Sequence, residues 1–300
     1  MTTKRSASIL ARLLNLARQR GDDYTLLLNR FALERLLCRV AASPHADRFL
    51  LKGALLFSLW YDQPHRPRRD AGLLGFGPDA AETLITTFRD IAAIGMADGI
   101  TFDPQSVRAD SIRDDNRYGG LRVRLNGRIA NVRCALQIDV GVGAAVTPEP
   151  QTVVFPVLLN DLPAPALKVY PVYTVIAEKY HAMTILGLAN TRMKDFFDIA
   201  TIARRTDLDG ATLARAIGAT FVRRVTTLPT HPPVALTGEF GGDDAKRRQW
   251  QAFLGKGRID ADTLAEIIEL LHTLLWPATQ VALSASDANA TWQARQLRWA

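Results

Sequence analysis

Cysteine is scarce in this chain of 300 residues, and the few histidines are scattered. The cysteines are Cys38 and Cys134, too few for the disulfide framework of a small secreted protein or for a cysteine zinc site. Both lie in apolar periodic segments, where we expect buried, reduced thiols. None of the five histidines has a partner at the spacing of metal ligands. The sequence therefore gives no reason to expect a metal centre built on sulfur or imidazole.

Long apolar runs are also missing. No uninterrupted apolar stretch approaches the ~20 residues that span a bilayer. Arg12 and Arg18 interrupt the apolar segment near the N-terminus, which makes it unsuitable as the core of a signal peptide. The chain has no internal repeat and no low-complexity tract. We therefore expect a cytoplasmic protein without a membrane partner.

The composition is that of a globular protein with a basic surplus. Apolar residues make up 48% of the chain and charged residues 22%, which fits one large domain or two smaller ones. The net charge is +7, and residues 1–40 contribute +5 of it, with eight basic side chains against three acidic ones. Such an excess favours a polyanionic partner such as RNA, or an acidic protein, although a solvated basic face is the commoner explanation.

The first half of the chain mixes helix and strand patterns. Apolar spacing predicts helices over residues 7–19, 24–41 and 79–94, and strands over residues 49–51, 121–125, 132–140 and 153–159. Between the first of these strands and the segment that ends at Tyr61, Lys52-Gly53 forms a glycine turn. A further strand begins at Asp70.

The two strands near residue 130 suggest a hairpin. Asn126-Gly127 has the composition of a two-residue turn, which would pair residue 125 with residue 128 and Arg122 with Asn131. The polar face of that hairpin would carry Arg124, Arg133, Gln137 and Asp139. Asp139 is therefore expected among basic side chains on one face of a sheet.

The second half of the chain is predicted to be helical. The expected helices cover residues 173–186, 194–204, 211–223, 244–254 and 263–276. Thr263 and Glu266 suit a capping box, and Trp292 and Trp299 are expected to anchor the end of the chain after a mobile segment at 284–290. We predict three parts, which are basic N-terminal helices over residues 1–46, an α/β core over 47–162 and a helical domain over 163–300.

The glycine turn and the acidic residues after it suggest phosphate chemistry. A glycine where a strand passes into a helix lets the backbone approach a phosphate, and a carboxylate at the start of the next strand could hold a metal ion against it. Lys52-Gly53 followed by Asp70 has this order, and Asp139 lies on another strand. The glycine turn alone is a weak signal, because most such glycines only end an element.

A second cluster of charged residues lies in the helical half. It comprises Lys179, Lys194, Asp195 and Asp198. Asp195 and Asp198 are three residues apart, so they share a face of their helix. A solvated, self-paired helix face explains this cluster about as well as a binding site does.

Four blocks of the sequence resemble the AbiEii/AbiGii toxin family of nucleotidyltransferases. In chain order they are FLLKGALLFSLWYDQPHRPRRDAGLLGFG, LQIDVGVGAAVTPEP, EKYHAMTILG and RMKDFFDIA. The resemblance covers about residues 48–205. It implies an α+β fold, with a nucleotidyltransferase-like mixed sheet core, N-terminal helices and a C-terminal helical region.

The resemblance also implies a function and a set of partners. Such a protein is the toxin of a type IV toxin–antitoxin system and transfers a nucleoside monophosphate from an NTP to an acceptor, with tRNA as the implied RNA acceptor. Mg²⁺ is the implied cofactor, and the cognate antitoxin protein is expected to form no stable complex with the toxin. The basic N-terminal helices would be the surface for the RNA backbone.

The roles implied by the resemblance fall on nine residues. Those assigned to nucleotide binding are Lys52, Gly53, Arg69, Lys179, Lys194 and Asp195. Those assigned to catalysis are Asp70, Asp139, Lys179 and Asp198. Asp70 and Asp139 are also the implied Mg²⁺ ligands.

The chain departs from the Asp-x-Asp pattern of the family, because Gly72 stands where the second aspartate is expected. Gly72 cannot ligate a cation, and its neighbours Ala71 and Leu73 point to the other face of a strand. The loss of one of three carboxylates predicts weaker Mg²⁺ binding and an impaired enzyme.

Three alternatives stay open at this point. The chain could be a catalytically inactive nucleotide- or RNA-binding protein that keeps the fold. It could recruit a replacement carboxylate from Asp62 or Asp79. It could also serve mainly to bind an antitoxin.

Overall fold

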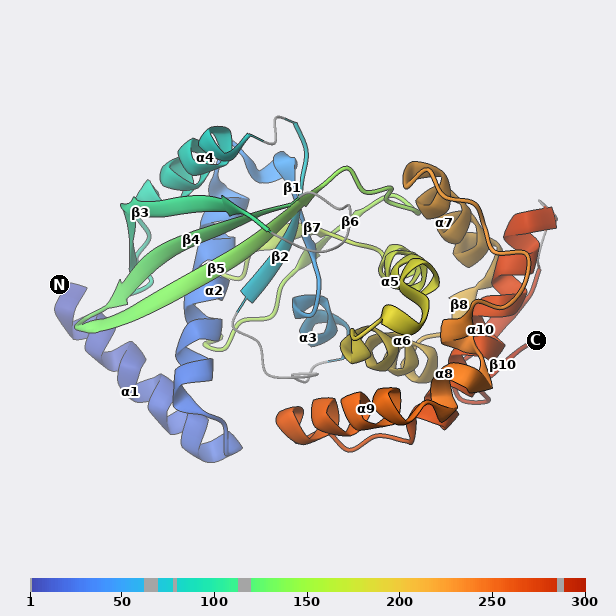
Figure 1. Cartoon of the computed structure of the whole chain (residues 1–300). Helices are drawn as coiled ribbons and strands as arrows, with labels where there is room; N and C mark the ends of the chain where they lie inside the picture. Colours follow the sequence, from blue (N-terminus) through green and yellow to red (C-terminus); the bar gives the residue numbers. More distant parts are fainter. Residues whose placement is uncertain (1, 62–69, 78–79, 113–119, 285–288) are drawn as a thin grey trace. The chain divides into compact units, whose positions relative to one another are not determined.

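The computed structural model describes residues 2–61, 70–77, 80–112, 120–284 and 289–300 (Figure 1). The chain divides into two compact units. Unit 1 comprises Met1–Gly143 and Gln151–Tyr170, and unit 2 comprises Ala144–Pro150 and Pro171–Ala300.

Unit 1 is built on a mixed sheet. Over the described residues this sheet has seven strands in the order β3-β4-β5-β2-β1-β7-β6. In chain order they are β1 (Phe49–Lys52), β2 (Asp70–Gly75), β3 (Thr101–Ser111), β4 (Gly120–Ile129), β5 (Val132–Val142), β6 (Gln151–Val154) and β7 (Ala166–Val169). The pairs β2–β5 and β1–β7 are parallel, and the remaining neighbours are antiparallel.

One face of this sheet is covered by helices. Helices α2 (Tyr24–Ala42) and α4 (Ala81–Ala93) contact its strands (Figure 1). The buried side chains of β4 and β5 alternate toward that face, as Val123 and its partner Ile138 illustrate. Phe88 of α4 packs against Phe49 of β1 with ring centroids 5.6 Å apart. The opposite face of β4 and β5 is polar and open to solvent.

The hairpin between β4 and β5 does not turn where the sequence suggested, so that prediction was wrong. Asn126 and Gly127 lie inside β4, Gly127 pairs with Cys134, and the turn follows Ile129, where Ala130 has φ +50°. Gly127 belongs to the buried face, because an added Cβ would lie 2.9 Å from a ring carbon of Phe102. The glycine makes room for a neighbouring aromatic ring rather than bending the chain.

Strand β3 was not anticipated. It runs along the edge of the sheet beside β4, with a break in register between Asp103 and Arg108. Pro104 and the charged residues around this bulge hide the alternating pattern of a strand, since proline is tolerated only at edges and bulges.

The N-terminal helices belong to unit 1. Helix α1 (Thr2–Arg20) packs on α2, and Asp23 caps α2 by accepting from the Leu26 amide. The guanidinium of Arg39 on α2 binds both carboxylate oxygens of Asp98 at 2.7 and 3.1 Å. Both side chains are buried, so this pair ties α2 to the segment that leads into β3.

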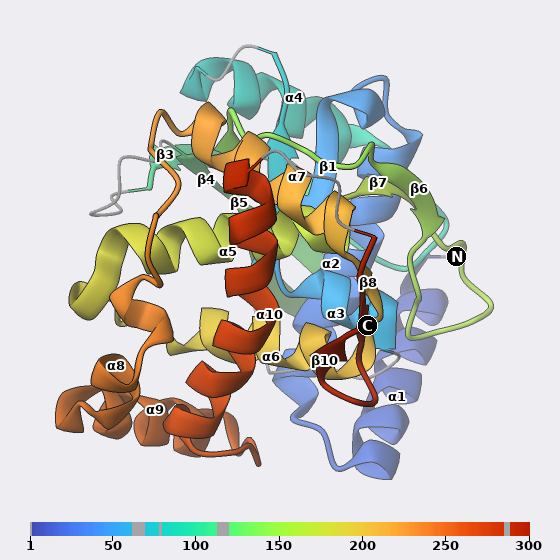
Figure 2. The ribbon, with the colours of Figure 1, turned by 90° about the vertical axis from the view of Figure 1, so that its right-hand side faces the viewer.

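Unit 2 is mainly helical. Its α-helices are α5 (Val172–Leu186), α6 (Met193–Arg205), α7 (Gly210–Arg223), α8 (Gly238–Gly242), α9 (Asp244–Gly257) and α10 (Leu264–Ser284). Figure 2 shows α10, in red, beside α7 and α6, which it contacts. The capping box expected at Thr263 is present. The Thr263 amide donates to the Glu266 carboxylate, and the Glu266 amide donates to the Thr263 hydroxyl.

The end of the chain is held by two tryptophans, as predicted. Over the described residues, β8 (Leu208–Asp209), β9 (Thr291–Gln293) and β10 (Arg298–Trp299) form a small antiparallel sheet. Trp292 is fully buried and donates to the carbonyl of Ala203 at 2.7 Å. Trp299 packs edge-on against Trp292. Residues 285–288 of the segment expected to be mobile lie outside the described residues.

The mixed sheet, the N-terminal helices and the helical second unit confirm the α+β class. Both cysteines are buried free thiols, as expected. Among the described residues, no helix combines the length and the apolar character that crossing a membrane requires.

A buried acid on α2 makes the stability of the fold sensitive to pH. Burial raises the pKa of Glu34 to about 7, although its carboxylate accepts from the Leu158 amide and pairs with Arg30. The folded protein therefore binds more protons than the unfolded chain between pH 4.5 and 7, so the free energy of unfolding falls as pH rises through this window.

We expect urea unfolding to show a loss on the order of 3 kcal/mol between pH 5 and pH 8 from this residue. The Glu34→Gln variant should lack this part of the pH dependence. Parallel pH profiles for the two proteins would contradict the assignment.

Candidate active site

Four positions form a row across the sheet of unit 1, here called the central row. Lys52 of β1 pairs with Gly72 of β2, Gly72 pairs with Asp139 of β5, and Asp139 pairs with Arg122 of β4. Residues directly opposite one another on neighbouring strands point to the same face. The central row therefore lies on the polar face of the sheet, opposite the face that α2 and α4 cover.

Asp139 is bound by an arginine within this row. The Arg122 guanidinium donates to the two carboxylate oxygens through Nε at 2.8 Å and Nη2 at 2.9 Å. The amide of Gln137 also points to this carboxylate, at 3.4 Å. The expectation that Asp139 lies among basic side chains is met, but its partner is Arg122. Sequence reasoning missed this partner because the turn predicted at Asn126-Gly127 pairs Arg122 with Asn131, whereas the observed register pairs it with Asp139.

Lys52 lies flat on the polar face of the sheet. An added Cβ at Gly72 would be 3.4 Å from Cγ of Lys52, and one at Gly141 would be 2.7 Å from its Nζ. The ammonium also lies 5.6 Å from the ring centre of Tyr170. Within the residues that the structure describes, no carboxylate pairs with Lys52. Gly72 and Gly141 thus provide the space that the Lys52 side chain occupies.

Gly53 adopts a backbone conformation that suits glycine. Its φ is +79° at the turn between β1 and α3 (Leu55–Tyr61), and an added Cβ would meet no atom within 4 Å. The limit on substitution here is therefore the backbone and not space.

Two of the predicted site residues cannot be placed by their side chains. The backbone of Asp70 pairs with that of Gln137, two residues along β2 from the central row, but the Asp70 carboxylate lies outside the described part of the structure. Arg69 lies outside the described residues, as do Asp62 and Asp79, the candidate replacement carboxylates.

The described side chains of unit 1 do not fit a magnesium site. Mg²⁺ prefers several oxygen ligands in octahedral geometry, whereas Asp139 already binds Arg122 and Gly72 offers no ligand. No group of three or more His, Cys, Asp or Glu side chains suited to a metal occurs in the described part of the chain. The metal role predicted for Asp70 and Asp139 remains a prediction.

A second charged cluster lies inside unit 2. The ammonium of Lys179 on α5 contacts Asp195 at 2.5 Å and Asp198 at 2.8 Å, both on α6. Arg192 binds the other oxygen of Asp195 at 2.7 Å. Asp195 and Asp198 do share one helix face, as the spacing predicted, and that face meets α5.

Burial and pairing act against each other in this cluster. Burial alone would lower the pKa of Lys179, but the two aspartates raise it above its ordinary value. Burial would raise the pKa of Asp195, but the charges of Lys179, Arg192 and Lys194 hold it below its ordinary value. Lys179 and Asp195 therefore stay ionised at neutral pH.

The cluster is self-paired but not solvated. Asp195 and Asp198 are each 1% exposed, so the alternative of a solvent-facing helix surface was wrong. The sequence could not reveal this, because the burial comes from α5 packing on α6. Lys194 is partly exposed on the same helix.

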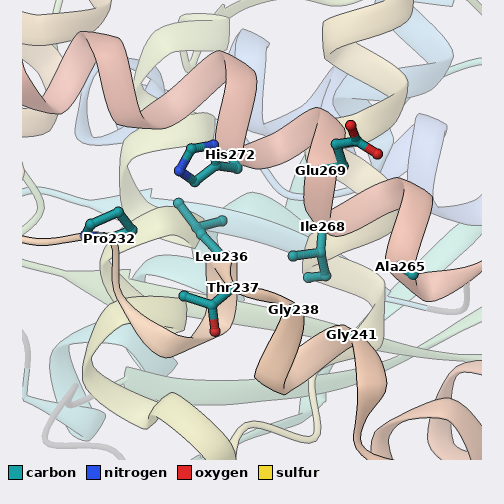
Figure 3. Close-up of a pocket in the computed structure, with 9 residues that line it drawn as sticks. All are labelled: Pro232, Leu236, Thr237, Gly238, Gly241, Ala265, Ile268, Glu269 and His272. Carbon is teal, nitrogen blue, oxygen red and sulfur yellow. The ribbon is translucent and has the colours of Figure 1, made fainter.

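The pocket of unit 2 shown in Figure 3 involves other residues. It has a volume of about 480 Å³, with Glu269 and His272 of α10 on one wall and Thr237 with Gly238 on another. None of the predicted site residues lines this pocket.

Comparison with known proteins identifies one family. A sequence model described as "Nucleotidyl transferase AbiEii toxin, Type IV TA system" matches residues 35–282. No protein with a curated functional description matches the chain.

Two solved structures from Helicobacter pylori are similar in fold. One is a candidate nucleotidyltransferase, with 14% identity and a TM-score of 0.44, covering 87% of this chain and 98% of the other. The second is the protein JHP933, with 14% identity and a TM-score of 0.41, covering 87% and 97%. These similarities are too low to transfer the role of any residue.

The buried cluster of unit 2 predicts unequal effects of the same substitution at two lysines. Lys179→Met leaves two buried carboxylates without their shared cation and should reduce the free energy of unfolding by about 3 kcal/mol or more. Lys168→Met removes an exposed pair with Asp47 at 2.7 Å and should cost less than about 1 kcal/mol. Urea unfolding at pH 7 compares them, and equal costs would contradict the cluster.

Proposed function

Because the chain belongs to the family of AbiEii nucleotidyl transferase toxins of type IV toxin–antitoxin systems, we propose that it is built to transfer a nucleoside monophosphate from an NTP to an RNA acceptor such as tRNA. We further propose that this transfer is impaired here by Gly72. The family supports transferase activity, and the RNA acceptor and the impairment are our proposals.

The observation that carries the impairment is the parallel register of β2 and β5. Gly72 is the direct neighbour of Asp139 on the polar face of the sheet. An aspartate at position 72 would place a second carboxylate beside the first, where the two could share a cation. With glycine there, the described side chain that pairs with Asp139 is Arg122.

The cations of the central row suit the phosphates of an NTP. Lys52 and Arg122 flank Gly72 and Asp139 from the two sides. Charge-assisted hydrogen bonds from ammonium and guanidinium groups are strong ligands for phosphate oxygens. We assign Lys52 to phosphate binding, with the Gly53 turn beside it. Arg122 donates to both carboxylate oxygens of Asp139, so these oxygens are occupied while the pair is intact.

The family resemblance implies Mg²⁺, which in such enzymes neutralises the phosphates and orients the leaving group. The described side chains do not form a site for this ion. In unit 2, the proposed contact of Lys179 with a triphosphate requires its ammonium to be shared with Asp195 and Asp198. We propose that these two aspartates position Lys179, and that Lys194 of α6, which is partly exposed, also contacts the nucleotide.

A binding protein without turnover is the second candidate. It is favoured by one observation: the central row keeps two cations but has a single carboxylate, and that carboxylate is paired. Such a protein would bind nucleotide or RNA phosphates and transfer nothing. The type IV system also includes an antitoxin, and we propose that it acts without forming a stable complex with this chain.

Restoring the missing carboxylate tests both candidates. Gly72→Asp, assayed with labelled NTPs, total tRNA and Mg²⁺, should transfer label at least about tenfold faster than the chain with Gly72, a gain of about 1.4 kcal/mol in transition-state stabilisation. Mg²⁺ should also raise the Tm of Gly72→Asp, because a ligand that binds only the folded state stabilises it.

Gly72→Ala is the matched control. An added Cβ lies 3.0 Å from the Lys52 carbonyl oxygen, so alanine reproduces the steric effect without the carboxylate and should show neither gain. Equal transfer by the unchanged chain and by Gly72→Asp would overturn the impairment. Nucleotide binding by all three proteins without transfer by any would favour the binding protein.

A further inference from the structure

The basic surplus near the N-terminus does not form one surface. Arg35 and Arg39 of α2 are each 1% exposed and are used inside the fold, where Arg35 donates to the Pro163 carbonyl and Arg39 binds Asp98. Arg12 of α1 pairs with Asp161. The expectation that the basic N-terminal helices hold RNA is therefore wrong for Arg35 and Arg39, because their buried guanidinium groups cannot reach a phosphate.

A different basic surface lies on the sheet. It is the polar face of β4 and β5, here called the hairpin face, and it consists of Arg122, Arg124, Asn126, Arg128, Arg133, Ala135, Gln137 and Asp139. Four of these eight residues are arginines, and one is acidic. Arg124, Arg128 and Arg133 are exposed.

Like charges are paired across the strands on this face. Arg128 lies directly opposite Arg133 at the end of the hairpin, and Arg124 lies directly opposite Arg108 of β3. Such pairs destabilise a sheet unless an anion lies between or above them. The repulsion between Arg124 and Arg108 is reduced by the ion pair of Arg124 with Asp110. Within the described residues, Arg128 and Arg133 have no ion-pair partner, and the Nε of Arg133 donates to Asn126 at 3.1 Å.

The hairpin face leads to the central row. Asp139 and Arg133 lie six residues apart on β5, which is roughly 20 Å along a strand. Arg124 lies between them, opposite Gln137. We propose that the hairpin face holds the phosphate backbone of the RNA acceptor, so that the chain of RNA runs along β4 and β5 toward Asp139. This inference rests on the proposed RNA acceptor.

The chemistry of the face favours an RNA backbone over other partners. Guanidinium groups bind phosphates in bidentate fashion and carry no base preference by themselves. The hairpin face has no aromatic side chain on which bases could stack. It also lacks the large apolar anchors that dominate protein interfaces. The surface therefore fits sequence-independent contact with a polyphosphate chain.

The test is RNA binding without NTP. Fluorescence anisotropy of labelled tRNA should show that Arg128→Gln/Arg133→Gln binds at least tenfold more weakly than the unchanged chain. The slope of log K against log salt should become shallower by about 1.4, because two contacts to single-stranded phosphates are lost. The Tm should stay equal or rise, because the repulsion between the two arginines is removed.

Arg18→Gln/Arg20→Gln is the matched control. It removes two exposed arginines from the end of α1 in the same unit and should change RNA affinity less than threefold. Equal losses in both variants, or a loss in the α1 variant alone, would overturn the proposal. Unchanged binding by Arg128→Gln/Arg133→Gln would do the same.

A single charge reversal separates binding from folding. Arg133→Glu creates an attractive pair with Arg128 and should raise the Tm while weakening RNA binding. Polyglutamate serves as a probe for an acidic protein. If it binds as tightly as tRNA, and if the variants lose this binding to the same extent, the partner of the hairpin face is an acidic protein and not RNA. The same two substitutions, Arg128→Gln and Arg133→Gln, can be added to Gly72→Asp. If that protein still transfers label to RNA with an unchanged KM for RNA, the RNA-binding role of the hairpin face is refuted but the proposed function is not.

Discussion

The parallel pairing of β2 with β5 is the constraint on which the candidate site depends. Backbone hydrogen bonds fix the register of these strands, and the register makes Gly72 the neighbour of Asp139. A slip of one residue would move every side chain of β2 to the other face and put Ala71 or Leu73 there instead. The buried positions of those two residues, both 2% exposed, hold the register in place. The packing of the apolar face thus determines which groups meet on the polar face.

Arginine serves two purposes in unit 1. On α2 it is a structural residue, because the Arg39 guanidinium satisfies Asp98 and the carbonyls of Ile94 and Ile100 inside the fold. On β4 it is a surface residue, and at the candidate site Arg122 forms a bidentate pair with Asp139. The net charge of the sequence could not distinguish these uses, since it counts buried and exposed cations alike.

Much of the fold could be predicted from periodicity, and the failures have local causes. The helices of both halves were found because their apolar faces repeat every three to four residues. The alternation in residues 132–140 correctly placed Asp139 on a polar face. The prediction of a hairpin turn at Gly127 failed because the glycine is required there by the Phe102 ring of another strand, which leaves no space for a side chain. The burial of Asp195 and Asp198 could not be predicted for the same kind of reason, because it depends on contact with another element, α5.

The stem of Lys52 lies over Gly72, on the polar face of the sheet where an anion would bind to the central row. The row as it stands holds two cations and one carboxylate, so a phosphate can balance its charge without help from a divalent ion. A carboxylate at position 72 would make the row neutral, and an incoming phosphate would then need a metal ion as its counter-charge. On the proposed function, the glycine at position 72 thus favours binding of an anion by the two cations of the row without a divalent ion.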